Sequence, residues 1–193
     1  MMRKPLKFCT PFAFAGLLIL CATPAAFGCG FHNLEMQLES MYPGSLTVAM
    51  ALHRAGENGV INATALEAPS KGTARYDDSV DRLQAFRKAL GASPAAAKLP
   101  ASFSLGYVES HLWSRYSQSN GEVHVDIHTD GPAIGEAVVL TGEPVLTEVL
   151  AGRLSVDRAL ADGLIIIEGN EKGQAAIRQA LKAMSMSDRI SRL

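Results

Sequence analysis

The spacing of apolar residues changes near Ser102, and this change constrains the fold more than any other feature of the sequence. Before it, the segment 77–90 carries apolar side chains at steps of three and four, the period of an amphipathic helix, at Val80, Leu83, Phe86 and Leu90. After it, apolar and polar residues alternate over short segments, as in half-buried strands. The chain therefore combines a helical part with a part rich in strands.

The expected elements follow in a simple order. The sequence predicts a helical turn or two at 34–39, a helix capped by Ser45, a loop at 67–76 and a helix opened by Asp77 or Asp78. The strand part comprises segments 102–107, 122–129, 137–141 and 164–167, the turn pair Asn120-Gly121, short helices at 144–150 and 156–161, and a last helix capped by Asn170. Because strands and helices are segregated, we expect an α+β domain with a mostly antiparallel sheet of four to five strands and helices packed on one face.

Residues 1–28 have the three parts of a bacterial secretory signal. Arg3, Lys4 and Lys7 form a positive start, residues 12–21 an apolar run, and residues 23–28 a short end of mostly small residues. The apolar run is shorter than the roughly 20 residues that a membrane-spanning helix needs. We therefore expect a cleaved signal peptide and a periplasmic or other extracytoplasmic protein. It would have a helical segment at 29–76, an α+β domain at 77–184 and a tail at 185–193.

Cys29 directly follows this segment. Ala26 and Gly28 place small residues where a signal peptidase needs them, and the same stretch is a loose match to a bacterial lipobox. In the first case the protein is free in the periplasm. In the second, Cys29 is the lipid attachment site and holds the chain to a membrane.

The charge of the mature chain excludes one class of partner. The signal carries three of the 18 Lys and Arg residues and none of the 19 Asp and Glu residues, which leaves a net charge of −4. With no basic cluster, nucleic acid binding has no electrostatic basis. Cys9 and Cys21 leave with the signal, so the mature chain holds no internal disulfide.

Two groups of residues are candidate metal ligands. On a strand at 122–129, the side chains of His124, Asp126, His128 and Asp130 share one face, and neighbours two apart are roughly 6.6–6.8 Å apart. Asp126 and His128 could bind one ion with further ligands, such as His111; otherwise this face is only a solvated polar surface. Cys29 and His32 form a small Cys-x-x-His that could hold copper or zinc if Cys29 is not lipidated.

The sequence contains no motif that indicates an enzyme. It lacks a Gly-x-Ser-x-Gly elbow, a phosphate-binding loop and a His-Glu-x-x-His pair. Trp113 and Tyr116 are expected to pack their rings in the interior, and Arg115 between them is a weaker candidate for binding a ligand carboxylate.

The segment 137–170 is the most informative part of the chain. It is predicted to run as a strand, a helix ending at Gly152-Arg153-Leu154-Ser155, a short helix through Ala159 ending at Gly163, and a strand ending at Ile167-Glu168-Gly169-Asn170. This order resembles the C-terminal half of the sterol carrier protein type two family of lipid-binding domains. The resemblance covers about residues 101–184, and residues 30–76 lie outside it.

The resemblance implies an apolar tunnel between the sheet and the C-terminal helices. The residues expected near it are Leu140, Leu146, Val149, Leu150, Leu160, Ile166, Ile177 and Leu181. The alternative is that these side chains fill a packed core. The leading hypothesis is a non-enzymatic, exported domain without a cofactor that binds or carries an acyl chain, a sterol or a quinone-like lipid. The alternatives are a periplasmic metal-binding protein and a structural or assembly partner with a filled core.

Overall fold

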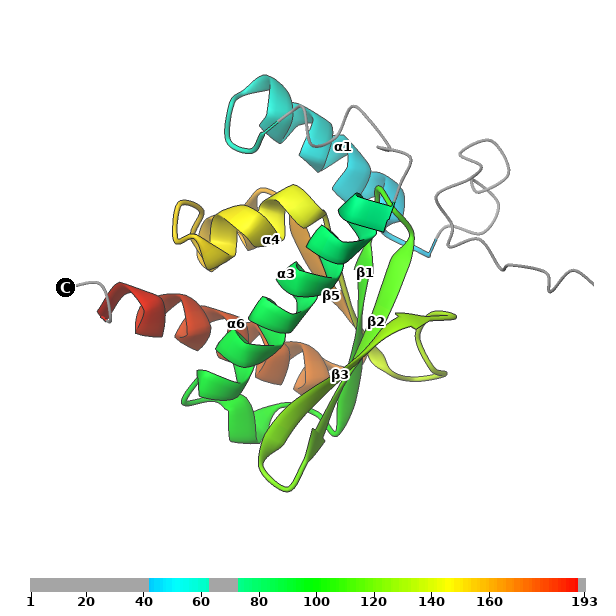
Figure 1. Cartoon of the computed structure of the whole chain (residues 1–193), viewed down its shortest axis with the longest axis vertical. Helices are drawn as coiled ribbons and strands as arrows, with labels where there is room; N and C mark the ends of the chain where they lie inside the picture. The colour runs from blue at the N-terminus through cyan, green and yellow to red at the C-terminus, as the bar shows by residue number, and fades with distance from the viewer. Residues whose placement is uncertain (1–41, 63–72, 191–193) are drawn as a thin grey trace, which may run out of the picture.

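The computed structural model describes residues 42–62 and 73–190 (Figure 1). The helices are α1 (Ser45–Glu57), α3 (Thr73–Ala92), the short 3-10 helix η2 (Ala96–Lys98), α4 (Glu143–Leu150), α5 (Val156–Ala161) and α6 (Glu171–Ile190). The strands are β1 (Ser102–Tyr107), β2 (Leu112–Ser119), β3 (Glu122–Thr129), β4 (Ala137–Thr141) and β5 (Ile165–Glu168). The turn predicted at 34–39 and the part of the predicted loop at 67–72 lie outside the described residues.

The strands form one mixed sheet in the order β3-β2-β1-β4-β5. The pairs β1–β2, β2–β3 and β4–β5 are antiparallel, and only β1 and β4 run parallel. The Asn120-Gly121 pair closes the β2–β3 hairpin, with both residues at positive φ as a type I′ turn requires. The predicted α+β class with a mostly antiparallel sheet is confirmed.

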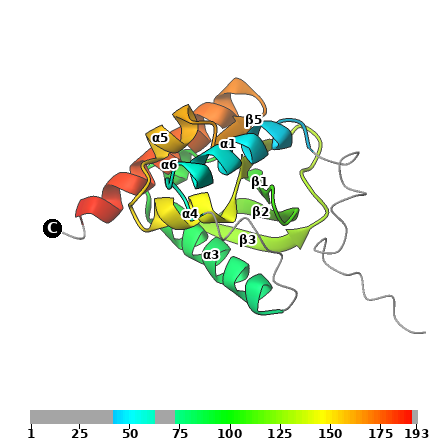
Figure 2. The same ribbon diagram turned by 90° about the horizontal axis from the view of Figure 1, so that it is seen from above.

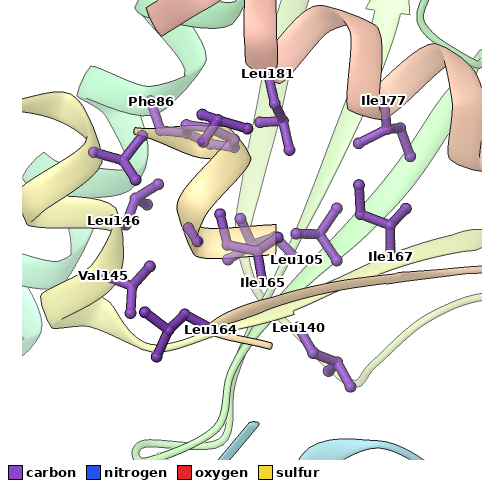
Figure 3. Close-up of a cluster of buried hydrophobic side chains, with 14 of the residues drawn as sticks. Phe86, Leu105, Leu140, Val145, Leu146, Leu164, Ile165, Ile167, Ile177 and Leu181 are labelled. Atoms are coloured by element: carbon purple, nitrogen blue, oxygen red, sulfur yellow. The ribbon is translucent and has the colours of Figure 1, made fainter. Parts of the chain in front are cut away.

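One face of the sheet packs against the main helical layer. Figure 3 shows Leu105, Ile165 and Ile167 pointing toward Ile177 and Leu181 of α6. Further along this face, Tyr116 is stacked on Phe103 with ring centroids 5.1 Å apart, and Phe86 of α3 meets Tyr116 edge to face at 5.4 Å. Tyr116 is fully buried, as predicted, so these aromatic rings join α3 to the sheet.

The opposite face carries different side chains. Leu140 is paired in register with Ile166, and because side chains alternate along a strand, both point away from α6. Trp113 covers Gly106 so closely that a Cβ there would stand 2.8 Å from the indole ring, and Tyr42 packs edge to face on the indole at 5.6 Å. This side of the sheet is thus partly covered by residues next to α1.

Helix α1 belongs to the same hydrophobic core as the sheet, although it lies outside the segment of the resemblance. Val48, Leu52 and Ala55 are buried in the common apolar cluster. Gly142, at the end of β4, permits this approach because a Cβ there would meet Leu52 at 2.7 Å. Figure 2 shows α1 crossing above the sheet. No helix among the described residues is both long enough and apolar enough to cross a membrane.

Several helix ends differ from the prediction. Gly44, in the left-handed conformation, precedes α1, so Ser45 is its first residue and not its cap. Helix α3 starts at Thr73 and continues through Gly91, since an isolated glycine weakens a helix by only about 1 kcal/mol and need not end it. Helix α6 reaches Ile190 and so extends into the segment expected to be a tail. The caps at Ser155 and Asn170 are confirmed by hydrogen bonds from the N–H groups of Arg158 and Gly173.

Candidate functional site

Two open cavities adjoin at the loop between β3 and β4. The first, of about 610 Å³, is lined by residues 98–102, 133–137, Asn170, Lys172, Gly173 and Ala176. The second, of about 550 Å³, is lined by Tyr42, residues 132–136, Gly169 and Asn170. Because they share Ala133 to Glu136 and Asn170, we treat them as one site and call it the trough. It lies where the first residues of β1, β4 and α6 meet.

The wall shared by both cavities belongs to an apolar loop, Gly131–Gly135, of which Ala133, Ile134 and Gly135 line both. None of its three side chains is polar, and Ile134 at its tip is fully exposed, at 108%. The loop is nevertheless held firmly at its base. The Ala133 N–H donates to Glu136 Oε2 at 2.8 Å, and Arg115 donates to the carbonyl oxygen of Gly131 at 3.0 Å. The exposed apolar tip is therefore presented in a fixed shape.

Glu136 is the buried anchor of this loop, with a side chain only 3% exposed. Its carboxylate accepts a hydrogen bond from the Ser104 hydroxyl at 2.8 Å and forms an ion pair with Arg115 at 3.3 Å. Burial by itself would raise the pKa of Glu136. The hydrogen bonds from Ala133, Ser102 and Ser104 and the positive charge of Arg115 outweigh burial and lower that pKa. Arg115 is therefore occupied by Glu136, which argues against its predicted role toward a ligand carboxylate.

The other wall of the trough is the first turn of α6. Gly169 and Gly173 let this turn approach β4 closely, because a Cβ at Gly169 would stand 2.9 Å from Ala137 Cα. The Asn170 side chain caps the helix by accepting from the Gly173 N–H at 2.8 Å. Lys98 and Lys172 are exposed and line the first cavity, where they offer two ammonium groups.

The eight residues predicted to surround a tunnel are placed mostly within the packed core. Leu146, Val149, Ile177 and Leu181 are at most 3% exposed, whereas Leu150 and Leu160 are partly buried against the same cluster. Leu140 and Ile166 lie on the opposite face of the sheet from Ile177 and Leu181. The structure thus does not bring all eight residues together, and they lie apart from the lining of the trough. Their contact with a ligand stays a prediction.

The candidate metal ligands on β3 lie on the solvent side. His124 and Asp126 are exposed and Val123 and Val125 face inward, as predicted. A bulge at His128, which has φ +68° and is skipped in the pairing with β2, breaks the predicted alternation at that residue. His128 makes an edge contact with Tyr76, and burial lowers the pKa of His111. Within residues 42–62 and 73–190, no group of three or more His, Cys, Asp and Glu side chains is arranged to hold a metal ion. Cys29 and His32 lie outside the described residues.

A second buried polar cluster joins α3 to the start of α4. The Ser79 hydroxyl donates to Glu143 at 2.7 Å, Arg82 pairs with the same carboxylate, and Glu109 accepts the Glu143 N–H. Burial, reinforced by nearby Tyr116 and these carboxylates, raises the pKa of the Tyr107 phenol well above its usual value. Tyr107 is therefore neutral, and the cluster serves to fix the two helices together.

The sequence reasoning missed the trough because its walls come from three separate parts of the chain. One local signal was available. The Gly131–Gly135 segment connects two strands through two glycines and a proline, which are usual turn residues, but it has no polar side chain and includes Ile134.

No protein-family model and no curated protein matches the chain. Among solved structures, it is similar to sterol carrier protein 2 like 2 from Aedes aegypti, at 17% identity over 54% of this chain and 97% of that one, with a TM-score of 0.41. It is also similar to the UbiJ-SCP2 ubiquinone synthesis protein, at 14% identity over 58% and 96%, with a TM-score of 0.41. A third similar structure is the inverting sec-alkylsulfatase Pisa1 from Pseudomonas sp., at 15% identity over 46% and 14%, with a TM-score of 0.35.

Two of these three structures are of sterol carrier protein 2 type, the family that residues 137–170 resemble in sequence. The predicted resemblance is thus also found among solved structures. The chain spans only 14% of the sulfatase. Because all three TM-scores are below 0.5, we draw no conclusion about function from these likenesses.

Proposed function

We propose that this chain is an exported, non-enzymatic protein that binds an amphipathic lipid in the trough, with the acyl part of the ligand along the apolar loop. The observation that carries this proposal is the trough itself. Its larger cavity, of about 610 Å³, falls within the size range of roughly 300–1,000 Å³ that is usual for small-molecule sites. The ligand class agrees with the one that the sequence of residues 137–170 implies.

The chemistry of the lining supports a ligand with two unlike ends. Leu99, Pro100, Ala101 and Ala176 offer apolar contacts in the first cavity, and Ile134 extends them toward the second. Lys98 and Lys172 offer positive charge at one end, to which a carboxylate or phosphate would bind. A fatty acid or a similar single-chain anionic lipid satisfies both requirements better than a neutral sterol.

The only tryptophan of the chain gives a direct test of ligand binding. Trp113 packs on Tyr42, and Tyr42 lines the second cavity. A fatty acid brominated near its methyl end should therefore quench Trp113 fluorescence on titration. One brominated next to the carboxylate should quench less, because the carboxylate binds at the lysine end. Equal quenching by both, or none, would contradict this orientation.

Replacing Ala176 with phenylalanine is expected to weaken binding of this fatty acid at least about tenfold, which corresponds to roughly 1.4 kcal/mol. Ala176 lines the first cavity and is half-buried, so a phenyl ring there takes up ligand volume. Ala175→Phe is the matched control, because Ala175 is the preceding residue of α6 and is exposed outside the trough. Trp113 quenching titrations measure both affinities. Unchanged affinity in Ala176→Phe would exclude the trough as the ligand site.

The export part of the proposal rests on residues 1–28, which lie outside the described residues. We expect the protein purified from its own host to begin at Cys29. Intact-mass spectrometry of that protein distinguishes a free Cys29 from a diacylated, N-acylated one. A mass that includes residues 1–28 would overturn the expectation of cleavage.

A further inference from the structure

The apolar loop is unusual in being exposed and firmly held at the same time. Its five residues offer no polar side chain to water, and Ile134 at the tip is fully exposed. Among the described residues, the other exposed large hydrophobic side chains are Leu46 and Met50 of α1, at 64% and 58%. The Glu136 and Arg115 contacts hold the base of the loop, so the tip does not fold back to bury Ile134.

Two lysines line the same cavity as this tip. They are Lys98 on η2 and Lys172 on α6. A lysine can lay its aliphatic stem along apolar material and keep its ammonium group at a headgroup phosphate. An apolar tip flanked by cations is the arrangement by which peripheral proteins bind a lipid surface. Asp130 and Glu171 are exposed nearby, so the net charge is small and the apolar tip must supply most of the binding.

We infer that the apolar loop docks on a phospholipid bilayer, with Ile134 at the acyl boundary and Lys98 and Lys172 at headgroup phosphates. Docking in this orientation turns the mouth of the trough toward the membrane, because Ile134 belongs to the wall of both cavities. A lipid could then pass between bilayer and trough without crossing bulk water. The docking surface goes beyond the proposed function, since it needs no ligand in the trough.

The test measures how deeply a side chain at position 134 enters the bilayer. In the full chain carrying Trp113→Phe, a tryptophan is introduced by Ile134→Trp, and vesicles of phosphatidylethanolamine and phosphatidylglycerol with brominated acyl chains are added. The matched control is Met50→Trp in the same background, because Met50 is also exposed and apolar but lies on α1. Any membrane attachment through a lipidated Cys29 affects both chains alike, so only local contact separates them.

We expect a blue shift and at least twofold quenching for Ile134→Trp and little change for Met50→Trp. Equal quenching at both positions, or none at position 134, overturns the inference.

A second measurement avoids the Trp113→Phe substitution, which removes a packed ring and could disturb the fold. It uses Ile134→Asp in the otherwise unchanged chain. It should slow the transfer of a fluorescent fatty acid between vesicles several-fold, whereas Leu46→Asp should not. If Trp113 of the unsubstituted chain is still quenched by free brominated fatty acid while docking fails, the proposed function stands without this inference.

Discussion

Gly169→Ala is expected to destabilise the fold by roughly 2–6 kcal/mol, the largest effect of any single methyl group added near the trough. Two costs combine at this position. Gly169 has φ +116°, and such strained conformations cost about 1–3 kcal/mol for a residue with a side chain. The new Cβ would also stand 2.9 Å from Ala137 Cα, and overpacking of this kind typically costs about 1–3 kcal/mol. Because the obstacle is backbone, no side-chain rotation relieves it.

Gly131→Ala separates the two costs. Gly131 has a similar φ of +128°, but nothing lies within 4 Å of a Cβ placed there. Urea unfolding of both variants should therefore show a smaller loss for Gly131→Ala, and the difference measures the contact between α6 and β4. Equal losses in the two variants would mean that α6 moves away from Ala137 without cost. The same movement would widen the trough, so fatty acid affinity is a second readout.

This contact also explains a motif that was visible in the sequence. The Ile167-Glu168-Gly169-Asn170 segment predicts a strand ending in a glycine and a helix cap, and the structure shows both. Asn170 caps α6 because its side chain reaches the N–H group of Gly173. Gly169 is required by its φ and by the neighbouring backbone of β4. Local chemistry of this kind is readable from sequence because the partners are a few residues apart.

The directions in which the side chains of β4 and β5 point could not be predicted in the same way. The strand 122–129 alternates apolar and polar residues, so its inward and outward faces follow directly from the sequence up to the bulge at His128. The strands 137–141 and 165–168 are apolar almost throughout, and such a pattern assigns no face. This is why the predicted tunnel combined Leu140 and Ile166 with Ile177 and Leu181, which lie across the sheet from them.

The trough was beyond sequence reasoning for a related reason. Its walls come together only because β1 and β4 pair in parallel, which brings residues 98–102 beside 133–137 and the start of α6. A parallel pairing between strands separated by a hairpin leaves no local signature, since its hydrogen bonds join distant segments. The sequence therefore predicted the class of fold, while the candidate site required the topology.

Glu136→Gln is expected to destabilise the protein by about 2 kcal/mol at neutral pH and to loosen the apolar loop. Breaking one partner of a buried ion pair costs roughly 3–5 kcal/mol, but Arg115 is about one-third exposed and water offsets part of that cost. Glutamine keeps the size of the side chain and can still accept the Ala133 N–H, so the loss reports mainly on charge. Urea unfolding measures it, with Glu122→Gln at the exposed start of β3 as the control.

The pH dependence of this loss identifies its cause. The pKa of Glu136 is lower in the folded protein than in the unfolded chain, where a glutamate titrates near about 4.3. The ionised carboxylate therefore contributes stability above that unfolded pKa, and the contribution is lost as pH falls through the lower, folded pKa. The difference in unfolding free energy between the unsubstituted chain and Glu136→Gln should be largest near pH 7 and shrink toward pH 3. If it stays constant over this range, the charge of Glu136 contributes nothing, and the loop is held by its backbone and hydrogen bonds alone.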